Sequence, residues 1–108
     1  MPDARYFAVR LHHGPAWDDS CGLREQEGWD EHAAFMDGLV DDGFVVLGGP
    51  VGDGSRVLLI CAAGGEEEVR RRLAADPWHG AAGMLAIASV EPWEVLLDGR
   101  GGPAAAEP

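Results

Sequence analysis

Alternation of apolar and polar residues near the start of the chain has the two-residue period of a β-strand. Residues 5–13 follow it, and the residues that share the apolar face are Phe7, Val9 and Leu11. Residues 44–47 and 56–62 predict two more strands, both with nearly unbroken apolar runs. The segment 52–55, Gly-Asp-Gly-Ser, is typical of the hairpin turn that would join them. Residues 84–90 predict a fourth strand.

Two segments change to the helical period. The first is expected over residues 26–42 and ends at Gly43, a residue suited to a left-handed C-terminal cap. Its apolar stripe consists of Trp29, Ala33, Met36 and Val40, with His32, Phe35 and Leu39 beside it. The second helix is expected over residues 66–75, with acidic residues in its first turn and arginines further on, as the helix dipole favours. Asp76-Pro77 ends it, because a residue before proline disfavours the α region.

Loops and chain ends complete this division. Residues 14–22 and 78–83 are rich in turn-forming residues and are expected to be loops. Residues 91–97 should extend the fourth strand at a sheet edge, because Pro92 cannot donate a hydrogen bond to a central ladder. Residues 1–98 are thus expected to form one domain, followed by a flexible Gly/Ala/Pro tail at 99–108.

The resulting order, β-α-β-β-α-β, predicts an α+β fold with an antiparallel sheet, the ferredoxin-like unit. Both helices of that unit cover the same face of the sheet. Residues 44–47 and 57–61 are apolar on both faces, so the second face also requires cover. A second copy of the same sheet is the simplest cover, and we therefore expect a homodimer formed through the sheet face.

Charge and cysteine content limit the possible functions. The chain carries 19 acidic residues, eight arginines and no lysine, and its formal net charge of −11 disfavours nucleic acid as a partner. The only arginine cluster, 70–72, follows Glu66–Glu68 and fits a charge-paired helix surface. Neither a leader sequence nor a membrane-spanning stretch is expected. Cys21 and Cys61 do not suggest a disulfide framework or a metal site, which favours a cytoplasmic protein with Cys61 in its core.

Three short motifs carry a resemblance to a known family. In the first, ten residues separate His32 from Gly43, and five residues separate Gly43 from Gly49-Pro50. The second is Asp76-Pro77-Trp78, and the third is Val90-Glu91-Pro92-Trp93. In this order and spacing the chain resembles the YciI-like (YCII-related) proteins over about residues 5–97. Its loops at 14–27 and 78–83 are longer than is usual in that family. The resemblance implies a dimeric α/β barrel with a His–Asp pair, His32 and Asp76, in a cleft of each protomer.

This pair can be assessed on physical grounds. If the helix begins near Trp29, His32 lies in its first turn, where the dipole disfavours an imidazolium. A carboxylate on one ring nitrogen, here that of Asp76, would fix the tautomer and stabilise the cation once it forms. Such a dyad is suited to general acid and base catalysis. A buried structural histidine and a turn-forming aspartate are the alternative interpretations.

Other candidate residues have weaker support. His79 and Trp78 follow Asp76 directly and are candidates for substrate binding, although a solvated loop histidine and a core tryptophan are the plainer interpretations. Arg10, with His12 or His13, could face the interior of a dimeric barrel; we select Arg10 and His12. No metal site and no cofactor are expected from the spacing of His, Cys and Gly residues.

The leading functional hypothesis is a small-molecule enzyme that uses His32 and Asp76 for proton transfer in an elimination, isomerisation or hydrolysis. The substrate would be a small organic molecule. The alternative is a dimer that binds a small ligand in the same cavity for regulation, without catalysis. A purely structural interaction module is the third possibility.

Overall fold

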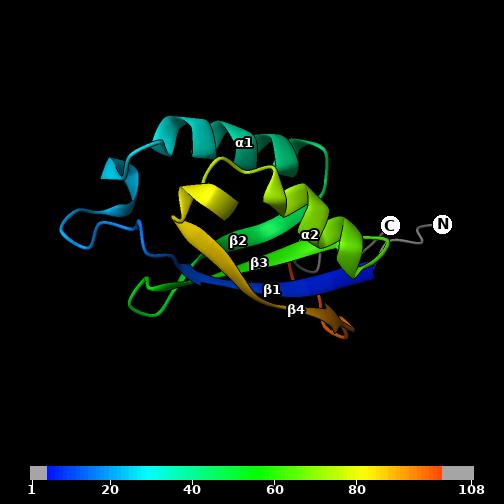
Figure 1. Cartoon of the computed structure of the whole chain (residues 1–108). Coiled ribbons are helices and arrows are strands. Elements are labelled where there is room, and N and C mark those ends of the chain that lie inside the picture. Colours follow the sequence, from blue (N-terminus) through cyan, green and yellow to red (C-terminus); the bar gives the residue numbers. More distant parts are fainter. Residues whose placement is uncertain (1–4, 101–108) are drawn as a thin grey trace.

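The computed structural model describes residues 5–100, and it is an α+β fold with a four-stranded antiparallel sheet and two helices (Figure 1). The strands are β1 (Arg5–His13), β2 (Val45–Val51), β3 (Arg56–Ala63) and β4 (Leu85–Trp93). The helices are α1 (Trp29–Asp41) and α2 (Glu66–Ala74), with short 3-10 turns η1 (Leu23–Glu25) and η2 (Gly80–Ala82). The predicted order β-α-β-β-α-β is confirmed.

The strands lie in the order β2-β3-β1-β4, and every neighbouring pair is antiparallel. This arrangement is compatible with the ferredoxin-like unit. The two edge strands, β2 and β4, each contain a proline, Pro50 and Pro92 respectively. A proline is tolerated there because no further strand requires its missing N–H. The expectation that Pro92 marks a sheet edge is confirmed.

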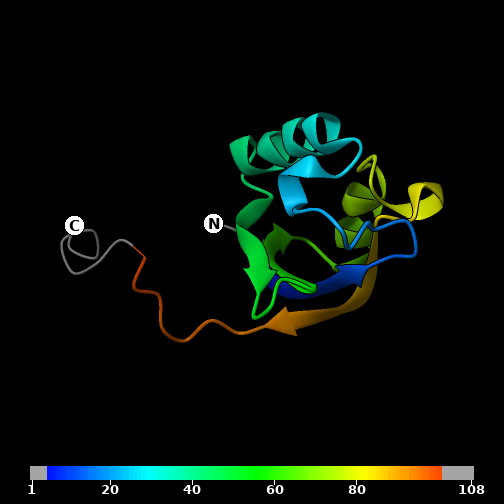
Figure 2. The same cartoon turned by 90° about the vertical axis from the view of Figure 1, so that its left-hand side faces the viewer.

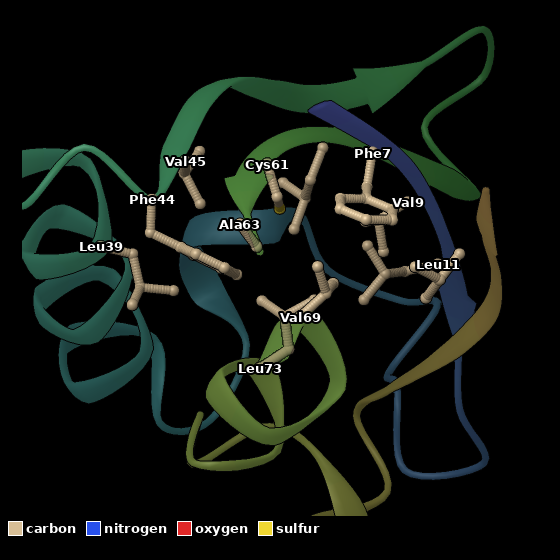
Figure 3. Packing of buried hydrophobic residues seen from close by; sticks show 12 residues of the cluster. Phe7, Val9, Leu11, Leu39, Phe44, Val45, Cys61, Ala63, Val69 and Leu73 are labelled. Atoms are coloured by element: carbon tan, nitrogen blue, oxygen red, sulfur yellow. The ribbon is translucent and has the colours of Figure 1, made fainter. Parts of the chain in front are cut away.

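Both helices lie on the same side of the sheet (Figures 1 and 2). The core fills the space between the sheet and the helices, as Figure 3 shows for side chains that converge from β1, α1, β3 and α2. Its buried members include Phe7, Val9, Leu11, Leu39, Phe44, Val45, Leu59, Cys61, Ala63, Val69, Leu73 and Val90. The prediction that Cys61 is a core residue is confirmed, and burial raises the pKa of its thiol to about 12.

The outer face of the sheet retains apolar residues that the two helices do not reach. Leu47 on β2 is 54% exposed and Trp93 at the end of β4 is 45% exposed. Leu96 and Leu97, in the segment after β4, are 80% and 91% exposed. Large apolar side chains exposed in this way are typical of a surface that contacts another molecule.

Helix α1 begins at Trp29 rather than at Gln26 as the periodicity predicted. Gly28 has a φ of 80°, which takes the chain out of the helical conformation immediately before Trp29. The Gln26 side chain is buried in the preceding loop, where its amide donates to the carbonyls of Asp18 and Cys21. Gly43, with a φ of 84°, follows the helix as expected of a left-handed cap.

Strand boundaries also differ from the sequence prediction. β2 continues through Gly48, Gly49 and Pro50 to Val51, because an edge strand tolerates both a proline and a local irregularity. β4 ends at Trp93, which pairs with Tyr6 on β1, and not at residue 97. Of the predicted tail at 99–108, residues 101–108 lie outside the described part of the chain. No helix in the described part is long and apolar enough to cross a bilayer.

Candidate functional site

His32 lies one turn into α1. Its backbone N–H donates to the carbonyl of Gly28 at 3.0 Å, the residue whose left-handed conformation starts the helix. The residue at which the helix begins therefore determines where on the helix surface the His32 side chain lies. The side chain is 11% exposed, so it is largely enclosed but still reaches the surface of a cavity.

Asp76 lies in the tight turn after α2, before Pro77. Its backbone N–H donates to the carbonyl of Leu73, and its carboxylate accepts the backbone N–H of Trp78 at 3.0 Å. This turn points the carboxylate inward, and only 2% of the residue is exposed. The Asp-Pro sequence thus ends the helix, as predicted, and also fixes a buried carboxylate.

The two residues are in direct contact. Nδ1 of His32 lies 2.9 Å from both carboxylate oxygens of Asp76. With an ionised carboxylate, Nδ1–H is the donor, and this leaves Nε2 as the ring nitrogen that can exchange a proton. Nε2 makes no hydrogen bond with any residue between 5 and 100. The two residues that the sequence selected therefore lie in hydrogen-bond contact, 44 positions apart in the chain.

Trp78 supports the histidine from the side. Its indole is stacked on the His32 ring, with 4.0 Å between the centroids and 6° between the planes. Its Nε1–H donates to the carbonyl of Glu27 at 3.0 Å, and the residue is 2% exposed. Trp78 belongs to a second buried cluster with Met84 and Leu85. Trp78 is therefore both a buried core residue and a direct neighbour of the candidate site.

His79 is also brought to this site. Its Nε2 lies 3.7 Å from Oδ2 of Asp76, and its side chain is 6% exposed. Burial lowers the pKa of His79, although the Asp76 carboxylate opposes this effect; the nearby His32 ring lowers the pKa further. Asp76 is thus approached by two imidazoles, one within hydrogen-bond distance and one just beyond it.

A cavity of about 730 Å³ opens beside this cluster. Its walls include the loop before α1, α1 itself, β2 and the β2–β3 hairpin. His32, Asp76, Trp78 and His79 all line it. This volume is within the usual range for small-molecule sites, about 300–1,000 Å³.

Arg10 and His12 lie elsewhere. Both are exposed, and they alternate along β1 with Val9 and Leu11, which face the core, so they lie on the outer face of the sheet. Arg10 forms an ion pair with Glu91 on β4. Within one chain they do not join the His32 cluster. His13, which the sequence analysis set aside in favour of His12, lines the cavity instead.

Part of the cavity wall was not predicted from the sequence. Trp17, in the predicted loop, stacks on His13 with 3.7 Å between centroids and lines the cavity. Trp29, Met36 and Val40 line it as well, whereas Leu39 packs into the core. The stripe of Trp29, Met36 and Val40 was visible in the helical period, but the period alone cannot tell a core from a cavity.

Among residues 5–100, no three His, Cys, Asp or Glu side chains are grouped closely enough to hold a metal ion. Comparisons with models of protein families, with curated proteins and with solved structures found no match to this chain.

Proposed function

We propose that this protein is a small-molecule enzyme in which His32 and Asp76 transfer a proton to or from a substrate held in the cavity. The observation that carries the proposal is the 2.9 Å contact between His32 Nδ1 and both oxygens of Asp76, at the wall of a cavity. A buried carboxylate on one imidazole nitrogen, with the other nitrogen directed to a ligand, is the arrangement used by many general bases.

The roles of the two residues follow from their positions. Nε2 of His32 would take a proton from a carbon or a water molecule, and Asp76 would stabilise the imidazolium that forms. In an elimination, the electron pair of the broken C–H bond becomes the new double bond, and the leaving group departs with its own pair. In an isomerisation, the imidazolium would return the proton to another carbon. In a hydrolysis, the deprotonated water would bond to an electrophilic carbon of the substrate, and the leaving group would depart with the pair of the broken bond and take the proton from the imidazolium.

The same surroundings favour this chemistry over bulk solvent. Asp76 is almost fully buried, and Trp78 covers one face of the His32 ring. Both contacts reduce the freedom of the imidazole, so its position does not have to be organised during the reaction. The reaction that we propose needs no cofactor, because each step moves only a proton and the electron pairs of the substrate.

We further propose that the chain is a YciI-like protein that forms a dimeric α/β barrel. The strand order β2-β3-β1-β4 and the helices on one face support this assignment, as does the His32–Asp76 contact that the resemblance implied. The exposed Leu47 and Trp93 on the outer side support a dimer formed through the sheet. In that dimer Arg10 and His12 would face the partner's sheet.

The test is an NMR measurement of the His32 ring in the wild type and in Asp76→Asn. In the wild type we expect the neutral ring to carry its proton on Nδ1, which ¹⁵N chemical shifts of the imidazole report. The substitution removes the charged acceptor of the Nδ1–H group, so the preference of the neutral ring for the Nδ1-protonated tautomer should weaken. Asp98→Asn is the control, since Asp98 pairs with Arg100 away from the cavity.

Two results would contradict the dyad. One is a tautomer preference of His32 that Asp76→Asn leaves unchanged; the other is a wild-type ring protonated on Nε2 when neutral. In either case the non-catalytic alternative, a small-ligand-binding or regulatory dimer, becomes the better account of the cavity. If the coupling is present, a screen of small organic substrates with His32→Gln as the inactive control tests catalysis directly.

A further inference from the structure

The charged side chains that line the cavity are carboxylates. The acidic residues that line it are Asp19, Asp37, Asp53 and Asp76, and no arginine lines it. The chain has no lysine that could supply a positive charge. Arg24, whose guanidinium lies 5.7 Å from the Trp29 ring, is close to the rim but not part of the wall.

Two of these carboxylates are available to a ligand. Asp53 is not one of them, because its carboxylate already accepts hydrogen bonds from the backbone N–H and the hydroxyl of Ser55 in the hairpin turn. Asp19 and Asp37 are exposed, and neither forms an ion pair or hydrogen bond with another described residue. An anionic ligand would enter a cavity whose fixed charges repel it, without a cation to offset the lost hydration.

The rest of the wall is aromatic and apolar. Trp17, Trp29 and Trp78 contribute indole rings, and Leu23, Met36 and Val40 add aliphatic surface. Indole faces attract cations, and the position of Arg24 near Trp29 is one instance on the edge of this site. A flat ligand with an apolar ring would bury its surface against this wall.

His79 adds a polar group inside the cavity that the protein does not use. Its side chain is 6% exposed and lines the cavity, and its Nε2 lies 3.7 Å from Oδ2 of Asp76, beyond hydrogen-bond distance. A ligand in the cavity could therefore form a hydrogen bond with this ring. Because burial lowers its pKa, the neutral ring would offer an acceptor to an N–H donor.

We propose that the cavity binds a small aromatic amine, with the ring against the tryptophans and the nitrogen near His79 and the carboxylates, and that it excludes carboxylates and phosphates. This inference rests on the proposed function in one respect: the bound amine would be the substrate on which His32 acts. It restricts the substrate class to neutral or cationic molecules.

Three probes of similar size test the inference: 2-phenylethylamine, 2-phenylethanol and phenylacetate, which are cationic, neutral and anionic near pH 7. Binding to the full chain would be followed by tryptophan fluorescence and by the NMR signals of His32 and His79. We expect the amine to bind at least about tenfold more tightly than phenylacetate, a difference of about 1.4 kcal/mol. The amine should shift the His79 signals.

Matched variants separate the cavity from the overall charge. Asp37→Asn should reduce the preference for the amine about two- to fivefold, the effect of one partly screened charge. Glu67→Gln removes the same charge from an exposed residue of α2 outside the cavity and should leave the preference unchanged. Thermal denaturation would confirm that both variants are folded.

The inference is overturned if phenylacetate binds as tightly as the amine, if Glu67→Gln acts like Asp37→Asn, or if no probe shifts the His79 signals at millimolar concentration. Its outcome is distinguishable from that of the dyad, which Asp76→Asn tests without any ligand. Amine binding with an uncoupled His32 would leave a binding protein, whereas a coupled His32 that prefers phenylacetate would leave an enzyme for anions.

Discussion

The imidazole of His32 is held in two perpendicular directions by residues only two positions apart, Asp76 at its edge and Trp78 on its face. The backbone N–H of Trp78 donates to the carboxylate of Asp76, so one turn of chain positions both groups. The Asp-Pro-Trp segment is therefore a single support for the histidine. Any substitution in it is expected to affect both stability and the state of the His32 ring.

Replacement of Trp78 by Phe should destabilise the fold by about 1–3 kcal/mol. Phe retains a ring that can stack on His32. It lacks the indole N–H that donates to the backbone carbonyl of Glu27, and it leaves part of the space of the indole unfilled. Trp78→Ala, which removes the ring entirely, should cost about 3–5 kcal/mol. Urea denaturation would measure both values. A Phe variant as destabilised as the Ala variant would contradict the view that the stacked ring carries most of the stabilisation.

Gly28 and Gly43 provide a matched pair, because both have φ near 80°. Alanine at either position should lower the free energy of unfolding by about 1–2 kcal/mol, because its Cβ disfavours the left-handed conformation. At Gly28 the new Cβ would also lie 3.1 Å from Nε1 of Trp78, whereas at Gly43 nothing lies within 4 Å. We therefore expect Gly28→Ala to lower the free energy of unfolding more than Gly43→Ala, and to perturb the His32 NMR signals as well.

Equal effects of the two alanine variants on stability, with His32 unaffected in both, would show that the Gly28–Trp78 contact adds no constraint. Thermal or urea denaturation of the two variants under identical conditions is sufficient for the comparison.

His79 should make stability depend on pH. Its pKa in the folded protein is below its ordinary value of 6.5, chiefly because burial disfavours the charged ring. The unfolded chain therefore binds a proton more readily, and the contribution of this group is fully present above about pH 6.5 and lost as the pH falls. One such group changes the free energy of unfolding by at most about 1.4 kcal/mol per pH unit.

Urea denaturation between pH 7.5 and 5.0 would test this, with His79→Gln as the variant. The wild type should lose more stability over this range than the variant. Glu67→Gln is the control, because Glu67 is exposed on α2 and the variant should follow the wild type. A variant that loses as much stability as the wild type would contradict the assignment to His79.

The proposed dimer can be tested at Trp93. Trp93→Glu places a charge on the exposed apolar side of the sheet and should convert a dimer of about twice the chain mass into a monomer. Ala34→Glu introduces the same charge at an exposed position on α1 and should leave the mass unchanged. Size-exclusion chromatography with light scattering measures the mass. A wild-type monomer, or a Trp93→Glu dimer, would overturn the proposed interface.

Much of the fold follows from local sequence. The alternation of Phe7, Val9 and Leu11 predicts a strand because only the β period brings these side chains onto one face. Asp76-Pro77 ends α2 for a steric reason that does not depend on the rest of the molecule. Boundaries that depend on partners were less accurate. β4 ends at Trp93, which pairs with Tyr6 of β1, and strand pairing of this kind cannot be found from residues 91–97 alone.

The resemblance to the YciI-like proteins, carried by three spaced motifs, implied His32 and Asp76 as a pair. Local sequence by itself left a buried structural histidine and a turn-forming aspartate as alternatives. It could not distinguish His12 from His13, nor a core stripe on α1 from a cavity wall. The hydrophobic period shows which side chains share a face of an element, but not what packs against that face. Only the tertiary structure decided that Trp17, Trp29 and His79 gather around His32. Those contacts join segments distant along the chain, and their geometry is set by the packing of the helices and the preceding loop against the sheet.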